Sequence, residues 1–271
     1  MKKQSLLFKI SFSALFIALT IILSRFFALP ALFGISFLKI SFANSVVMFS
    51  SFLLGPLWGA IVGGAADVIG ALLFPQGGAF NPAYTIPAVL TGLCPYFFYK
   101  LFNLIKVDKK IPLVLIILLS VFNLFLGSFF IFNDSVKVSK NPVAFSLTLK
   151  IVLISLCVAL SVVYIIAAIF VKRKFADKKI NSEINIFSLI TAMFATYMIV
   201  KNPVSALITS FFVNYDFLAI LFTKILAGFF TCLIHSIIVI IALNVTLTVN
   251  MTPAICVNKR VKENDEEAEN N

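Results

Sequence analysis

The sequence has few charged side chains and little of the chemistry that builds catalytic sites. Only 12% of its 271 residues are charged, and it holds one histidine and one tryptophan. A soluble domain of this length needs a more polar exterior, so the low charge excludes an ordinary soluble protein. With 61% hydrophobic residues and a mean hydropathy of +1.07, the composition predicts a polytopic membrane protein.

Metal-binding and catalytic signatures are also missing. The four cysteines are far apart and have neither metal-site spacing nor the pattern of a disulfide framework. No HExxH, G-x-S-x-G or Walker A motif occurs, so a P-loop ATPase activity is excluded for this chain alone. We therefore expect no enzyme activity, no metal and no cofactor.

The net charge of +11 reports membrane topology. Fifteen of the 22 basic residues fall on one side when the N-terminus is placed in the cytoplasm. Cytoplasmic segments of membrane proteins carry such an excess of Lys and Arg. We expect a multi-pass protein of a bacterial plasma membrane with both termini cytoplasmic, and we expect no nucleic-acid partner.

The apolar segments are spaced as transmembrane helices. At roughly 20 residues per span they predict about eight helices, in an all-α bundle. The seventh is interrupted by Lys201-Asn202-Pro203, so it is either one kinked span or two shorter pieces. The expected segments are 6–29, 42–54, 56–74, 83–101, 112–132, 143–171, 184–212 and 217–249.

The stretch LLGPLWGAIVGGAADVIGALL, which begins at Leu53, combines small residues with one acid. Small residues let helices approach closely, so this segment is expected to pack tightly within the bundle. Asp67 is too costly to face lipid and is expected to face protein or a polar cavity. It serves either as a structural hydrogen-bonding group or as a proton or cation site.

The sequence FPQGGAFNPAYT then breaks the helix on the outer side, because its prolines and glycines suit a shaped loop. Amide and hydroxyl groups in this loop and after it can recognise a flat heterocycle through several hydrogen bonds. An ordinary extracellular turn is the alternative. The candidate ligand-binding residues here are Gln76, Gly77, Asn81, Tyr84 and Thr85.

Basic residues also occur within or near the spans. Arg25 either extends to the outer interface or anchors an anionic ligand group. Lys150 and Lys224 lie inside predicted spans, where each can neutralise a carboxylate of the protein or of a ligand. The single histidine, His235, is expected to be a hydrogen-bonding group of the bundle.

Three segments together resemble the folate-type substrate-binding (S) components of energy-coupling factor (ECF) transporters, the FolT group. They are ALFIALTIILSRF, LLGPLWGAIVGGAADVIGALLFPQGG and YTIPAVLTGL. The resemblance implies a six-helix membrane protein that captures a vitamin at the outer face, and folate is the expected vitamin. It also implies association with two ATPases and a transmembrane coupling protein, which Ala14 and Ala18 would contact. Arg25 and Lys150 would then bind the carboxylates of folate.

The chain is longer than the family pattern by about two C-terminal helices. We therefore expect an S-component-like domain at 1–175, an additional helix pair at 176–250 and a polar cytoplasmic tail at 251–271. Duplication of an earlier helix pair is one origin that the sequence leaves open for 176–250. The leading hypothesis is a vitamin-binding subunit of an ATP-driven uptake transporter. The alternatives are an S component for another vitamin and a stand-alone secondary transporter coupled to protons or cations through Asp67. An intramembrane enzyme would need Asp67 and His235 as a catalytic pair and is the most remote reading.

Overall fold

The computed structural model describes most of the chain, including all of the expected helices. The described residues are 4–27, 41–75, 80–104, 112–133, 135–137, 142–144, 146–175, 180, 183–213 and 216–256.

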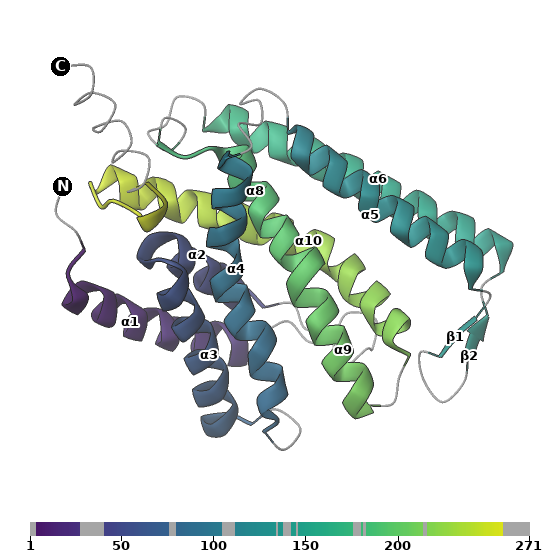
Figure 1. Cartoon of the computed structure of the whole chain (residues 1–271), viewed down its shortest axis with the longest axis horizontal. Coiled ribbons are helices and arrows are strands. Elements are labelled where there is room, and N and C mark those ends of the chain that lie inside the picture. Colours follow the sequence, from purple (N-terminus) through teal and green to yellow (C-terminus); the bar gives the residue numbers. More distant parts are fainter. Residues whose placement is uncertain are drawn as a thin grey trace.

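The helices follow the apolar segments closely (Figure 1). Among the described residues, six helical spans are long and apolar enough to cross a membrane, which confirms the prediction of an all-α polytopic bundle. The shorter α2 and the more polar α4 complete the set. The elements are α1 (Leu6–Arg25), α2 (Ala43–Leu54), α3 (Pro56–Leu73), the 3₁₀ turn η2 (Pro82–Tyr84), α4 (Thr85–Leu104), α5 (Leu113–Phe132), α6 (Leu147–Lys174), α8 (Ile186–Ala195), the π-helical turn η3 (Thr196–Lys201), α9 (Asn202–Val213) and α10 (Phe217–Thr248).

One small β-hairpin interrupts the helical pattern. Strands β1 (Ser135–Lys137) and β2 (Pro142–Ala144) pair antiparallel between α5 and α6, with Val136 opposite Val143. The hairpin lies at the end of the α5–α6 pair (Figure 1), so it leaves the helical body unchanged.

A tight turn joins α2 to α3. Gly55 has a φ of 106°, a conformation that side-chain-bearing residues rarely adopt, and Pro56 supplies a φ suited to the first helical position. The 12 residues of α2 extend only about 18 Å. A bilayer core is about 30 Å thick. Helix α2 therefore ends partway through the bundle and does not span it alone.

Helices α3 and α4 are in backbone contact. A Cβ atom added to Gly59 would collide with the carbonyl oxygen of Gly92, and one added to Gly92 would collide with the backbone of Gly59. Gly63 has the same relation to the carbonyl of Ala88. The small residues noted in the sequence thus produce the close approach that was expected of them.

The span formed by α8, η3 and α9 is the central helix of the molecule. In its apolar window 78% of residues are buried, against 22% in α6 and in α1. Every residue of α8 is buried. Polar side chains on this span therefore face protein far more often than lipid.

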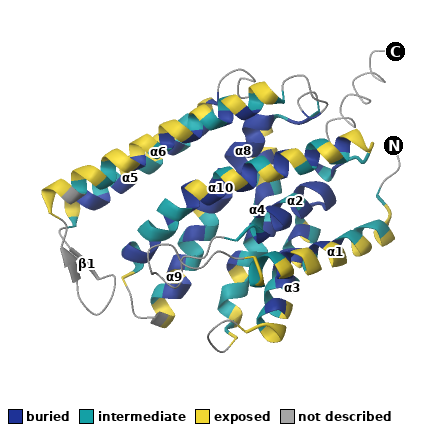
Figure 2. Cartoon of the chain, turned by 180° about the vertical axis from the view of Figure 1, so that it is seen from behind, coloured by how far each residue is buried: buried dark blue, intermediate teal, exposed yellow. Residues whose placement is uncertain are grey.

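The C-terminal helices lie inside the body of the protein. Helix α8 packs along α4, and α10 packs against α2 and α9. Helices α5 and α6 instead pair with each other at one edge, away from α1 and α3 (Figures 1 and 2). Their outward faces are exposed and apolar, as lipid-facing helices require (Figure 2). The domain boundary at residue 175 stays a prediction, but the helices beyond it share a core with α4.

Candidate functional site

The last turn of α1 places Arg25 against α3. A Cβ built on Gly70 would lie 3.2 Å from Nε of Arg25 and 3.5 Å from its Nη2, so the guanidinium rests on the glycine surface. The arginine is partly buried there. Because Gly70 has no side chain, the cation can lie against the bundle at this point.

One turn earlier on α3, Asp67 is paired with the first residue of α4. The hydroxyl of Thr85 donates a hydrogen bond of 2.8 Å to Oδ2 of Asp67. Both residues are partly buried. The expectation that Asp67 faces protein agrees with this contact, which gives the carboxylate a structural role between two helices. A proton or cation function for Asp67 stays a prediction.

The remaining loop candidates lie next to this pair or outside the described residues. Asn81 caps η2, since its Oδ1 accepts a hydrogen bond of 3.0 Å from the amide of Ala83. The ring of Tyr84 lies 6.4 Å from that of Phe212 on α9. Arg25, Asp67, Thr85 and Tyr84 therefore belong to the same end of the bundle. Gln76 and Gly77 lie outside the described residues.

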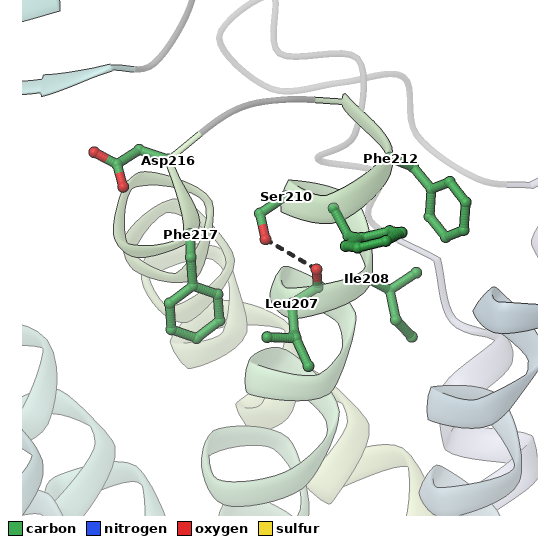
Figure 3. Close-up of a pocket in the computed structure, with 7 residues that line it drawn as sticks. Leu207, Ile208, Ser210, Phe212, Asp216 and Phe217 are labelled. Atoms are coloured by element: carbon green, nitrogen blue, oxygen red, sulfur yellow. Dashed lines mark hydrogen bonds between the residues drawn. The ribbon is translucent and has the colours of Figure 1, made fainter.

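An open pocket is present near this end, where α9 turns into α10 (Figure 3). It has a volume of about 450 Å³. Its Ser210 hydroxyl is already engaged with the carbonyl of Leu207 at 2.9 Å, and Asp216 points away from the other lining side chains (Figure 3). The pocket thus offers apolar and aromatic surface rather than hydrogen bonds. Its lining residues are Leu207, Ile208, Ser210, Phe211, Phe212, Asp216 and Phe217.

A second group of polar residues lies deeper in the bundle, between η3 and α10. The Tyr197 hydroxyl lies 2.5 Å from Nδ1 of His235, and Nε2 of His235 lies 3.0 Å from the carbonyl oxygen of Ser41. The ammonium of Lys201 lies 3.5 Å from the Tyr197 hydroxyl and 4.4 Å from the centre of its ring. This network joins η3, α10 and Ser41, which lies two residues before α2.

The donors and acceptors in this network follow from one carbonyl group. A carbonyl only accepts, so Nε2 of His235 carries a proton and donates to Ser41. In the neutral imidazole Nδ1 is then an acceptor, so the Tyr197 hydroxyl donates to it. The Tyr197 oxygen can then accept from the side chain of Asn44 and from Lys201. His235 is therefore a bundle hydrogen-bonding group, in agreement with the sequence-based expectation.

Lys224 on α10 is held by oxygens of α9. Its ammonium donates to the Ser205 hydroxyl at 2.5 Å, to the Thr209 hydroxyl at 3.2 Å and to the Ser205 carbonyl at 3.3 Å. Asn202 closes the same helix pair, because its amide donates to the Lys224 carbonyl at 3.2 Å. Lys224 thus makes three contacts with neutral groups and none with a carboxylate of the described residues.

The interruption at Lys201-Asn202-Pro203 is a local π-helical turn in one continuous span. Proline lacks an amide proton and its ring clashes with the carbonyl four residues earlier, so it disturbs regular α-helix. The wider turn of η3 accommodates this disturbance without ending the helix. Such turns are frequent at functional sites. The sequence pattern indicates Lys201 only as part of an interruption of the span and gives no signal for Tyr197.

Three further predicted residues are placed on other surfaces. Lys150 lies in the first turns of α6, at the edge of the molecule, so the structure does not bring it to Asp67 and Thr85. Its ligand-binding role stays a prediction. Ala14 and Ala18 are exposed on the same face of α1, four residues apart.

Metal ligands do not cluster in the described part of the chain. No group of three His, Cys, Asp or Glu residues there could hold a metal ion. Cys157, Cys232 and Cys256 are buried, and Cys232 contacts the hydroxyl of Tyr164 at 3.2 Å. These thiols serve as packing groups, as small apolar side chains do.

Comparison with known proteins gives two matches to the N-terminal part. The model of the family "ECF-type riboflavin transporter, S component" matches residues 6–172. The folate transporter FolT of Clostridium novyi (strain NT) is 33% identical over 102 residues, which are 37% of this chain and 54% of that relative. The chain thus spans about half the length of the curated relative. Because the family match covers more than half of the chain, the protein belongs to the ECF-type S-component family of membrane transport proteins and is not an enzyme.

Proposed function

We propose that this protein is the vitamin-capturing subunit of an ATP-driven uptake transporter in a bacterial cell membrane, with folate as its ligand and both termini in the cytoplasm. The family membership supports a transport component, and the name of the Clostridium relative supports folate. The observation that carries the proposal is the convergence of Arg25, Asp67, Thr85 and Tyr84 at one end of the bundle.

These residues come from α1, α3, α4 and the turn η2, and they combine a cation with hydroxyl and aromatic groups. A folate ligand has a flat pterin ring and an anionic glutamate tail. Aromatic and hydroxyl side chains suit the ring, and a guanidinium suits a carboxylate. The loop between α3 and α4 connects directly to this end of the bundle, where a ligand from outside would enter.

The outward face of α1 supports association with a coupling protein. Ala14 and Ala18 are exposed and are flanked on the helix surface by Leu7 and Ile22, which are 75% and 45% exposed. Small residues four apart permit close approach of a partner helix. The proposed partners are a transmembrane coupling protein and two ATPase subunits, because this chain contains no ATP-binding motif.

The name of the matching family model favours a second candidate ligand, riboflavin, within the same transport function. Riboflavin carries no charge, whereas folate is an anion. Folate binding therefore requires a cation of the bundle near the ligand carboxylates, whereas riboflavin binding does not.

The test is equilibrium binding of vitamins to the purified full-length chain in detergent. Folate and 5-formyl-folate are compared with riboflavin and other vitamins, and Arg25→Ala is compared with the wild type. Tight folate binding without partner proteins is expected, together with clear weakening in the folded variant. A folded wild-type chain that binds no vitamin would remove the proposal and would favour a proton-coupled or cation-coupled transporter.

A further inference from the structure

Lys201 lies deep in the central helix of the bundle. It is 15 residues beyond Ile186 and 12 before Val213, about 22 Å and 18 Å from the ends of the span. A charged side chain at such a depth is costly and faces the bundle interior or a polar cavity. Residues of this kind usually mark a substrate pathway or a binding site.

The contacts of Lys201 with other described residues leave most of its hydrogen-bonding capacity unused. An ammonium group has three N–H donors. Among the described residues, the Lys201 ammonium has one long contact with the Tyr197 hydroxyl, at 3.5 Å, and lies over the Tyr197 ring. The ring face attracts the cation but does not neutralise it.

No described acid is placed to neutralise this lysine. The described part of the chain contains Asp67, Glu183 and Asp216. Asp67 is engaged with Thr85, and Asp216 begins α10 in an exposed position. Glu183 precedes α8, whose first residue, Ile186, lies about 22 Å along the helix axis from Lys201.

A second cation lies on the neighbouring helix. Lys224 is held by Ser205 and Thr209, which follow Lys201 by one and two turns of the same span. Its partners are neutral oxygens, so its charge is held in place and is not cancelled. Two ammonium groups at the α9–α10 contact create a positive potential, which is strong because the surroundings are poorly polarisable.

We propose that Lys201 binds a carboxylate of the transported ligand and thereby selects anionic vitamins over uncharged ones. This inference rests on the proposed function and adds a specificity-determining residue outside residues 6–172. Tyr197 is a positioning residue, because its hydroxyl donates to His235 and its oxygen, which also contacts the side chain of Asn44, faces the Lys201 ammonium at 3.5 Å. Lys224 strengthens the attraction through its charge. The ligand class is a carboxylate-bearing vitamin such as folate, and riboflavin is disfavoured.

The experiment measures binding of two ligands to the wild type and three variants, Lys201→Met, Lys201→Arg and Lys100→Met. The ligands are folate and its α,γ-diamide, in which both tail carboxylates are neutral amides. All proteins are full length, and Lys201→Met keeps side-chain length and removes the charge. Lys100→Met is the matched control, because Lys100 is exposed near the end of α4.

The wild type is expected to bind folate about 10- to 100-fold more tightly than the diamide, the range typical of a hydrogen-bonded charge pair. Lys201→Met is expected to lose this preference, Lys201→Arg to recover part of it, and Lys100→Met to keep it. If Lys201→Met weakens the binding of both ligands equally, the lysine has a purely structural role and the inference is overturned. A preference for folate over the diamide that persists in Lys201→Met would also overturn it.

The wild-type comparison does not require any variant to fold. If the wild type binds folate and the diamide equally, or binds riboflavin alone, the anion site is overturned while the vitamin-binding function stands. If the folded wild type binds none of the vitamins, the inference falls together with the proposed function.

Discussion

The hydroxyl of Tyr197 and Nδ1 of His235 are 2.5 Å apart, which joins the π-helical turn η3 to the middle of α10. Tyr197→Phe would keep the ring and leave Nδ1 without its donor. We expect the free energy of unfolding to fall by about 1 kcal/mol, because hydrogen bonds between membrane helices contribute roughly that much. The change in free energy is measured by thermal and denaturant unfolding of both proteins in detergent.

Tyr84→Phe is the matched control for that substitution. The ring of Tyr84 contacts the ring of Phe212, and phenylalanine preserves this contact. Its unfolding free energy should stay within about 0.5 kcal/mol of the wild type. Equal losses in the two variants would contradict the special role of the buried Tyr197 hydroxyl.

The contact between α3 and α4 gives a steric prediction. Gly92→Ala would drive a methyl group into the backbone of Gly59, so the helices have to separate. We expect a loss of about 1–3 kcal/mol of stability, the usual effect of overpacking. Gly127→Ala on α5 is the control, since a Cβ there meets nothing within 4 Å. Its free energy of unfolding should lie within about 1 kcal/mol of that of the wild type. Similar losses of stability in both variants would argue against the backbone contact.

The hydrogen bond from Thr85 to Asp67 predicts a structural effect of mutation. Thr85→Val removes the hydroxyl but keeps the shape, so the carboxylate loses its described partner. We expect a loss of about 1.5–3 kcal/mol, the range for hydrogen bonds to charged groups. Asp67→Asn retains an acceptor oxygen and should lose less. The unfolding free energies of both variants in detergent decide this, and a larger loss in Asp67→Asn would indicate that the charge itself is required.

The energy source of uptake provides a separate prediction. If Asp67 is structural and transport is driven by ATP, ligand uptake by cells should persist after a protonophore collapses the proton gradient, provided that ATP is maintained. The measurement is uptake of radiolabelled folate with and without the protonophore. Immediate loss of uptake at constant ATP would support the secondary-transporter alternative instead.

The exposed alanines of α1 predict a defect in assembly. Ala14→Trp places a large side chain on the outward face and should block docking of a coupling protein, while the lipid-facing position tolerates it in the isolated chain. Co-purification with the partner subunits and folate affinity of the isolated chain are measured together. Ala159→Trp, at an exposed position on α6, is the control. Normal co-purification of Ala14→Trp would exclude this surface as the interface.

Part of the candidate site was predictable because the cost of burying charge is visible in a local stretch of sequence. A carboxylate within an apolar segment has to face protein, so the inward position of Asp67 followed from its neighbours. Its partner Thr85 is 18 residues away, on another helix. The sequence indicates both residues as candidates but does not pair them, because their distance depends on how closely α3 and α4 pack.

The deeper polar network was not predicted. The sequence signal of this network is a lysine, Lys201, inside an apolar segment. Because Pro203 follows two residues later, the same stretch also fits a simple interruption of the helix. Lys150, which appeared equivalent in the sequence, lies at the edge of the molecule because α5 and α6 form a peripheral pair. Lys150 and Lys201 thus have similarly apolar neighbours in the sequence but different neighbours in the folded protein.

The sequence by itself determined the membrane class, the positions of the helices and the small-residue face of α3, because hydrophobic transfer and the sterics of glycine act over neighbouring residues. Only the tertiary structure decided that α8, α9 and α10 join α2 and α4 in the body of the protein. It alone brought His235 to Tyr197, 38 residues away, and to Ser41, 194 residues away. The order in which helices pack depends on the complementarity of whole surfaces, which no local pattern of residues contains.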